Sequence, residues 1–194
     1  MKITKLTDDS SWLITTDEFS LVIDPWFTNQ QVDGFSWFSL QQRNESYGPF
    51  DFSQVKNLIL FITHPFSDHC NKETLLTFPK NTKVIAESRA FKKIESWNYF
   101  SELIKLTEAP FNIKQLTKVT LFNQTHHAFF FRLKDISLIY APHGVSTIQN
   151  IPSADVLMTT TTTYKLPFFL GGTVNLGLKK ANALRVKTDR KSVV

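Results

Sequence analysis

The sequence predicts an α/β fold built on mixed β-sheets. Short strand-like runs fill the first quarter of the chain, strands alternate with helices between residues 57 and 97, and strand-like runs return after Glu102. Alternation of this kind is typical of a layer in which helices cover a sheet. The 194 residues, 42% hydrophobic and 20% charged, suit one domain spanning residues 1–194 with a substantial core.

The first quarter predicts three short strands at residues 1–7, 11–15 and 20–24, separated by polar turns at residues 8–10 and 16–18. Pro25 then ends regular strand pairing. Residues 27–53 form a long segment rich in glutamine, asparagine, serine and aromatic side chains. A segment this long inside a compact domain is usually functional or disordered, and its aromatic content favours a packed flap around an apolar or ring-bearing ligand.

The middle of the chain predicts two strand and helix pairs. The apolar run at residues 57–62 is typical of a buried strand, and residues 72–77 form a short helix. Residues 83–86 form a second buried strand, followed by a helix over residues 88–97. Strands are then expected at residues 103–106, 113–116, 118–122, 129–133, 137–140 and 155–159, with a last helix over residues 176–186.

The chemistry-bearing residues follow the buried strand at residues 57–62. Within six residues, the loop after it contains His64, Asp68 and His69. A loop leaving a rigid strand can direct these side chains to one point, as a metal site or an acid/base site requires. The other histidines are expected near strand ends as well: His126, His127 and His143.

Imidazole and carboxylate ligands together suit zinc, iron or manganese. His126 and His127 are neighbours, and neighbouring residues of a strand point to opposite faces. At most one of these two histidines can therefore serve as a ligand.

The run His64-Pro65-Phe66-Ser67-Asp68-His69 resembles the first motif of the metallo-β-lactamase fold superfamily, His-x-His-x-Asp-His. Four further phrases resemble its cyanobacterial and plant-type branch: Ile23-Asp24-Pro25-Trp26, Ala141-Pro142-His143-Gly144-Val145, Ala154-Asp155-Val156-Leu157 and Leu166-Pro167-Phe168-Phe169-Leu170-Gly171-Gly172. The resemblance covers roughly Leu13 to Leu184. It implies a four-layer αβ/βα sandwich with a metal rim at one edge.

The resemblance also implies roles for individual residues. His64 matches a ligand of one metal site, and Asp68 and His69 match ligands of the other. Asp68 would in addition orient or deprotonate a metal-bound water, the nucleophile of a hydrolysis reaction on a small-molecule substrate. His126 or His127 falls near the third histidine of the first site. His143 falls where many members have a bridging aspartate.

Three departures from the family pattern change this expectation. Phe66 stands where the second histidine would be, His143 replaces an anionic bridge, and the chain ends at Val194 before the expected last strand and final histidine. Without that strand, one sheet would have an open edge that favours instability or a homodimer. We therefore expect one ion of zinc, iron or manganese, held by His64, Asp68, His69 and His143 with one of His126 and His127.

Two alternatives accompany the metal-site prediction. The first is a catalytically inactive binding or scaffold protein that kept the fold and lost the metal centre. The second concerns the run from His64 to His69 alone, which would be a loop-capping network in which Asp68 accepts from backbone N–H groups. Asp24 is interpreted as a structural acceptor behind the site.

Charge and cysteine content predict the binding partners and the cellular compartment of the protein. Much of the net charge of +5 comes from a basic tail over residues 179–194. We interpret this tail as a solvated helix end. Contact with nucleic acid is the alternative, but no nucleic-acid motif accompanies the tail. No apolar stretch reaches the ~18 residues that span a bilayer, so no membrane partner is expected. The lone Cys70, expected to be small and buried, and the absence of a signal-peptide core favour the cytoplasm.

Overall fold

The computed structural model describes residues 1–7, 9–28, 50–53, 55–121, 124–143, 152–159, 163–165 and 173–175. The chain divides into two compact units, Met1–Ala109 and Pro110–Val194. Within the described residues, no helix is long and apolar enough to cross a membrane.

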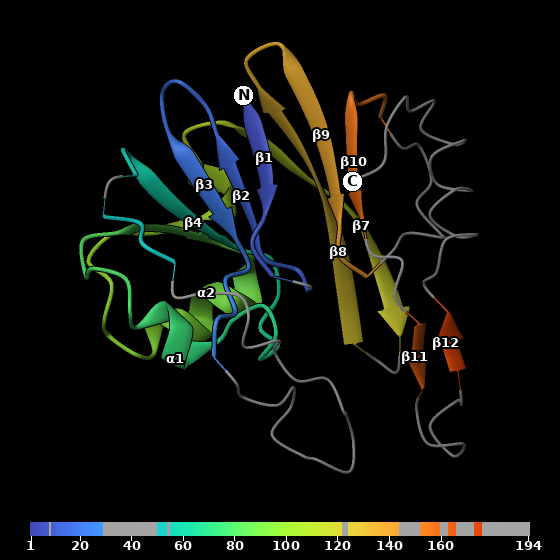
Figure 1. Ribbon diagram of the computed structural model, residues 1–194. Helices are drawn as coiled ribbons and strands as arrows, with labels where there is room; N and C mark the ends of the chain where they lie inside the picture. Colours follow the sequence, from blue (N-terminus) through green and yellow to red (C-terminus); the bar gives the residue numbers. More distant parts are fainter. Residues whose placement is uncertain are drawn as a thin grey trace. The chain divides into compact units, whose positions relative to one another are not determined.

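The first unit contains a six-stranded mixed sheet with the strand order β1-β2-β3-β4-β5-β6 (Figure 1). The first three strands pair antiparallel, and β3 to β6 pair parallel. Its strands are β1 (Lys2–Lys5), β2 (Trp12–Thr15), β3 (Ser20–Ile23), β4 (Leu58–Ile62), β5 (Lys83–Ala86) and β6 (Leu103–Lys105). The three strands predicted in the first quarter and the buried strands after them are thereby confirmed.

One helix follows β4 and another follows β5, and the residue before each helix caps its N-terminus with a side-chain oxygen. Asn71 accepts a hydrogen bond from the backbone N–H of Thr74 and begins α1 (Lys72–Leu75). The side chain of Glu87 accepts from the backbone N–H groups of Arg89 and Ala90 in the first turn of α2 (Ser88–Glu95). Such acceptors satisfy donors that a helix start would otherwise leave unpaired. Both helices are shorter than predicted, and η2 (Leu106–Glu108) follows β6.

The helices pack against one face of this sheet. Ala90 and Ile94 lie one turn apart on α2 and are buried in the same cluster as Leu75 of α1. The strand residues of the cluster are Val22, Leu60, Ile62, Val84 and Ala86. The alternate residues of the same strands, among them Leu21 and Phe61, are buried as well. Burial on both faces explains why these parallel strands read as continuous apolar runs.

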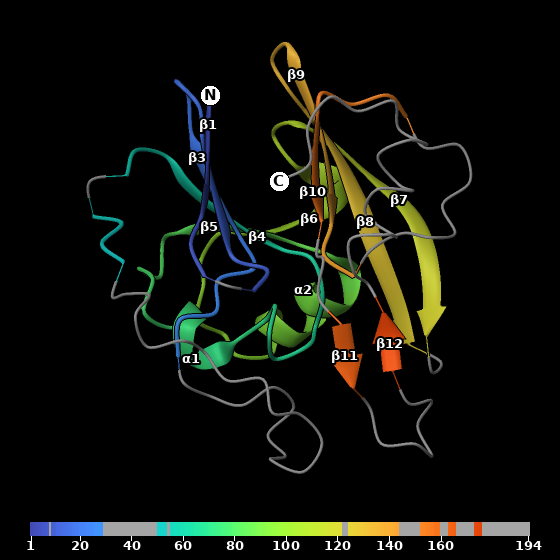
Figure 2. The same cartoon turned by 45° about the vertical axis from the view of Figure 1, so that its right-hand side comes forward.

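The second unit contains a four-stranded sheet with the order β10-β9-β8-β7 (Figure 2). Only the β9–β10 pairing is parallel among its described pairs. Its strands are β7 (Asn112–Leu121), β8 (Gln124–Leu133), β9 (Ile136–Ala141) and β10 (Val156–Thr159). A separate antiparallel pair joins β11 (Thr163–Lys165) and β12 (Thr173–Asn175).

The second unit corrects two predictions. Residues 113–116 and 118–122 were expected to be separate strands, but they belong to one strand, β7, whose register shifts between Gln115 and Lys118. An irregularity of this kind absorbs a break in the alternating pattern without ending the strand. The strand β8 begins earlier than predicted, so His126 and His127 lie inside it. The helix predicted at residues 176–186, the basic tail and residues 29–49 lie outside the described residues.

Candidate metal site

The candidate site lies where three parallel strands end at the same edge of the first sheet. Asp24 follows β3, Thr63 and His64 follow β4, and Glu87 follows β5. Backbone hydrogen bonds join these ends: Asp24 N–H donates to the carbonyl of Phe61 at 3.0 Å, and Glu87 N–H donates to the carbonyl of Ile62 at 2.9 Å. The carboxyl ends of parallel strands are where ligand sites gather in α/β sheets.

Asp24 is a buried hydrogen-bond acceptor at the end of β3. Its Oδ1 accepts from the backbone N–H of Thr63 at 2.8 Å, and its Oδ2 accepts from the Thr63 hydroxyl at 2.5 Å. The same Oδ2 lies 2.7 Å from Nδ1 of His69. Asp24 has φ 45°, a left-handed conformation that aspartate tolerates better than most residues. The interpretation of Asp24 as a structural acceptor is confirmed.

The hydrogen bonds around Asp24 assign the proton positions on both histidines. Thr63 has one hydroxyl proton, which it donates to the Asp24 carboxylate, so its oxygen accepts from Nδ1–H of His64 at 2.7 Å. Nδ1–H of His69 donates directly to Asp24. In the neutral form of each ring, the lone pair is therefore on Nε2. Metal-bound histidines typically have this arrangement, with the second ring nitrogen donating to a carboxylate or other acceptor.

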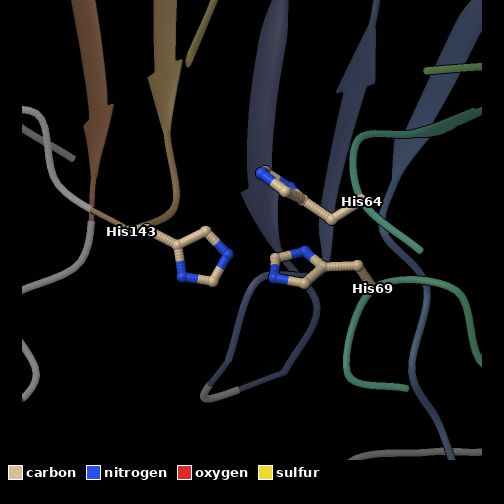
Figure 3. A group of neighbouring side chains, drawn as sticks. All are labelled: His64, His69 and His143. Atoms are coloured by element: carbon tan, nitrogen blue, oxygen red, sulfur yellow. The ribbon is translucent and has the colours of Figure 1, made fainter. Parts of the chain in front are cut away.

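His64 and His69 lie next to each other and are both buried (Figure 3). Their ring centroids are 4.9 Å apart, and a nitrogen of each ring lies within 4.8 Å of the other. Asp68 Oδ2 lies 3.5 Å from Nε2 of His69. Two ligands bound tetrahedrally to zinc at about 2.1 Å are about 3.4 Å apart. The spacing between Asp68 and His69 therefore fits two ligands of one ion.

The charge balance at His69 favours a cation. Burial lowers the pKa of this imidazole, but Asp68 and Asp24, with a smaller effect of Asp9, outweigh it and raise the pKa to about 9. Burial, with the nearby Asp68 carboxylate, raises the pKa of Asp9 to about 7. A metal ion bound at Nε2 of His69 would replace the proton there and bring its positive charge to the same carboxylates.

Phe66 occupies the position at which the resemblance places a second histidine. Its carbonyl accepts the backbone N–H groups of His69 and Cys70 at 3.1 Å and 2.6 Å, which closes the loop into a tight turn. The Phe66 ring stacks on His64 with the centroids 5.8 Å apart and the planes at 15°. Cys70, which follows His69 in the chain, is buried as predicted, and burial raises the pKa of its thiol to about 12. It is therefore a packing residue rather than a nucleophile.

The remaining predicted ligands belong to the second unit. His127 is buried on β8, and its Nδ1 is hydrogen-bonded to the side-chain amide of Gln115 on β7. The side chain of His126 lies outside the described part of the structure. His143 lies in the turn after β9, as expected from its position after an apolar run.

Sequence reasoning missed two residues of the first unit. Thr63 precedes the first histidine, yet its role as the link between Asp24 and His64 requires knowing that β3 and β4 are neighbours. Asp9 belongs to a predicted turn, and that turn contacts the loop from His64 to His69, where Ser10 Oγ donates to the carbonyl of Asp68 at 3.2 Å. The sequence signal for Thr63 is its position as a polar residue directly after the buried strand that ends at Ile62.

Comparison with known proteins identifies the family. The family model described as the beta-lactamase superfamily domain matches residues 2–184 and so spans both units. The chain belongs to this family. A comparison with curated protein sequences gave no match to this superfamily member.

Solved structures support the metallo-β-lactamase fold. A possible metal-dependent hydrolase from Veillonella parvula DSM 2008 has 16% identity and a TM-score of 0.75, over 100% of this chain and 84% of that chain. The isothiocyanate hydrolase from Delia radicum gut bacteria has 15% identity and a TM-score of 0.72, over 99% and 83%. The metallo-β-lactamase fold protein YhfI from Bacillus subtilis has 14% identity and a TM-score of 0.63, over 98% and 83%. The predicted α/β sandwich class is thereby confirmed.

Proposed function

We propose that this member of the metallo-β-lactamase superfamily is a metal-dependent hydrolase acting on a small-molecule substrate. The observation that carries the proposal is the hydrogen-bond network of Asp24, which fixes the proton on Nδ1 of both His64 and His69. Ordering two buried imidazoles in this way costs side-chain entropy and suits rings that must direct Nε2 at a ligand.

We infer a single ion of zinc, with iron or manganese as the other candidates. Two imidazoles and a carboxylate suit all three metals. The proposed ligands in the first unit are His64, His69 and Asp68. The proposal adds His143, with one of His126 and His127, from the second unit. Phe66 cannot bind a metal, and its side chain is the reason for proposing one ion rather than two.

When bound, the ion would act as a Lewis acid that lowers the pKa of a water molecule toward ~7. The residues of this chain would position and deprotonate that water. Asp68 is the proposed catalytic residue, because its Oδ2 lies beside Nε2 of His69 and can accept a proton there. Asp24 and Thr63 would hold the imidazoles still during the reaction without touching the substrate.

Hydrolysis of a panel of lactone, ester, thioester and β-lactam substrates tests this function. The zinc-loaded protein should hydrolyse at least one class. Asp68→Asn, assayed at a zinc concentration that keeps the remaining ligands loaded, should lower kcat by 10²-fold or more. The Ser67→Ala variant, at the neighbouring loop position, is the matched control and should retain activity. Hydrolysis that survives both chelation and Asp68→Asn would refute the proposed role of the site.

A non-catalytic binding or scaffold function is the second candidate. It is favoured by the ion pair between His69 and Asp24, because a protonated His69 neutralises this carboxylate without any metal. The substrate panel, repeated with iron and manganese, separates the two functions. Absence of hydrolysis with all three metals would favour the scaffold.

We also infer membership of the cyanobacterial and plant-type branch from the phrase at Asp24-Pro25-Trp26, and a cytoplasmic location from the lone, buried Cys70. A phylogeny in which the chain groups elsewhere would contradict the first inference. Fractionation of cells that places the protein in an oxidising compartment would contradict the second.

A further inference from the structure

The helix α2 is hydrogen-bonded through Lys93 to the loop that carries the proposed metal ligands. Nζ of Lys93 donates to the backbone carbonyl of Pro65 at 2.5 Å, across 28 positions of the chain. Pro65 directly follows His64, so the acceptor belongs to the peptide unit next to a proposed ligand. A hydrogen bond from a charged donor is shorter and stronger than one between neutral groups. Lys93 therefore holds the loop against α2 at this point.

The ammonium of Lys93 is used for this bond rather than for an ion pair. Within the described residues, the ion pairs of lysine and arginine join Lys83 to Glu102 and Arg89 to Glu87, and none involves Lys93. The side chain is partly buried, so its ammonium gives up part of its hydration. A buried polar or charged group needs an acceptor in exchange, and the Pro65 carbonyl is that acceptor.

The bond lies where the chain enters the tight turn of the loop. The next carbonyl, that of Phe66, accepts the backbone N–H groups of His69 and Cys70 and so closes the turn. The charge of Lys93 also reaches Cys70: burial raises the pKa of this thiol, and Lys93 opposes the rise. Lys93 thus lies near both the start and the end of the segment that contains Asp68 and His69.

The spacing of the two imidazoles depends on the backbone as well as on the rings. Asp24 and Thr63 orient the rings of His64 and His69 through their Nδ1 atoms. How far apart the two rings lie also depends on the path of the chain between them, and Lys93 fixes the start of that path. Metal ligands have to be held to within about 0.5 Å of the productive geometry.

We propose that Lys93 is a positioning residue of the metal site, which holds the Pro65 carbonyl and thereby sets the spacing of His64 and His69. The inference rests on the metal site of the proposed function and adds a residue that contacts neither metal nor substrate. The sign of its effect is diagnostic. By charge alone, a nearby ammonium would oppose a cation, so its removal would strengthen metal binding. Positioning predicts the opposite.

Zinc affinity of the Lys93→Met variant tests this sign, because methionine keeps an unbranched chain and lacks the donor. Competition with a chromophoric chelator should show binding weakened about tenfold, as is typical when a partner behind a ligand is lost. Lys93→Arg keeps a charged donor and should recover most of the affinity. The matched control is Lys92→Met, which removes an exposed cation from the same helix and should leave the affinity unchanged. Circular dichroism should show that all variants fold.

Amide hydrogen exchange of the metal-free protein tests the same role without zinc. In Lys93→Met, the N–H groups of His69 and Cys70 should exchange about tenfold faster, while those of β3 and β4 stay as slow as in the unmodified protein. Unchanged exchange in the loop, zinc affinity at or above that of the unmodified protein, or equal weakening by Lys92→Met would overturn the inference. Because the exchange measurement contains neither metal nor substrate, its failure is distinguishable from failure of the proposed hydrolase.

Discussion

The Thr63 hydroxyl lies 2.5 Å from Oδ2 of Asp24, and 39 positions of the chain separate the two residues. Through this contact, one carboxylate orients two imidazoles: His69 directly and His64 by way of Thr63. The orientations of the two imidazole rings therefore both depend on the Asp24 carboxylate. A change at Asp24 or Thr63 should alter metal binding although neither residue is a proposed ligand.

Thr63→Val should weaken zinc binding about 10- to 100-fold, the effect typical of losing a partner behind a metal ligand. Valine has nearly the shape of threonine but cannot accept from Nδ1–H of His64. Competition with a chromophoric chelator measures the affinity. Thr63→Ser keeps the hydroxyl and should restore most of it. If the Thr63→Ser variant binds zinc as weakly as the Thr63→Val variant, the hydroxyl does not determine the zinc affinity.

The metal-free protein should lose stability as the pH rises from 7 to 9. The pKa of His69 is about 9, against an ordinary value of 6.5, so the folded state binds this proton more tightly than the unfolded state. The resulting stabilisation is fully present below pH 6.5 and is lost as the pH passes 9; its size is roughly 3 kcal/mol. Urea unfolding at several pH values, with chelator present, measures the free energy of unfolding.

Asp24→Asn is the control for this pH dependence, because asparagine also tolerates the left-handed conformation at this position. Without the carboxylate, the pKa of His69 should fall and the slope between pH 7 and 9 should flatten. An unchanged slope in Asp24→Asn would mean that another group titrates.

Phe66→His should raise the number of metal ions bound per chain. The Phe66 ring already stacks on His64, so an imidazole on the same backbone would lie beside the site. Metal stoichiometry after reconstitution measures the effect, with Phe66→Leu as the control for loss of the phenyl ring. Unchanged stoichiometry in Phe66→His would count against the proposed arrangement of ligands.

Much of the first unit could be predicted from the sequence because its parallel strands are buried on both faces and read as uninterrupted apolar runs. The loop from His64 to His69 was placed correctly at the end of β4 for the same reason. The β7 and β8 strands were predicted less well. A register shift between Gln115 and Lys118 interrupts the alternation of β7, on which strand prediction depends. The first four residues of β8, Gln124 to His127, are polar, so the apolar signal of this strand begins only after them.

The network behind the histidines could not be derived from local sequence. Asp24 was recognised as an acceptor, but its partners are set by the parallel pairing of β3 with β4. The Thr63 hydroxyl binds Asp24, and the Asp9 carboxyl interacts electrostatically with Asp68 and His69. Both interactions join segments that are distant in the chain. The contact of the Arg89 guanidinium with the Phe66 ring likewise joins the start of α2 to the loop from His64 to His69.

Metal analysis of the protein purified without chelator is the decisive test of a metal site at His64 and His69. We predict close to one equivalent of zinc, iron or manganese after reconstitution, and less than about 0.1 equivalent in a His64→Gln, His69→Gln double variant, because a functional site fills readily. Less than about 0.1 equivalent in the unmodified protein, persisting after reconstitution with each metal, would contradict it.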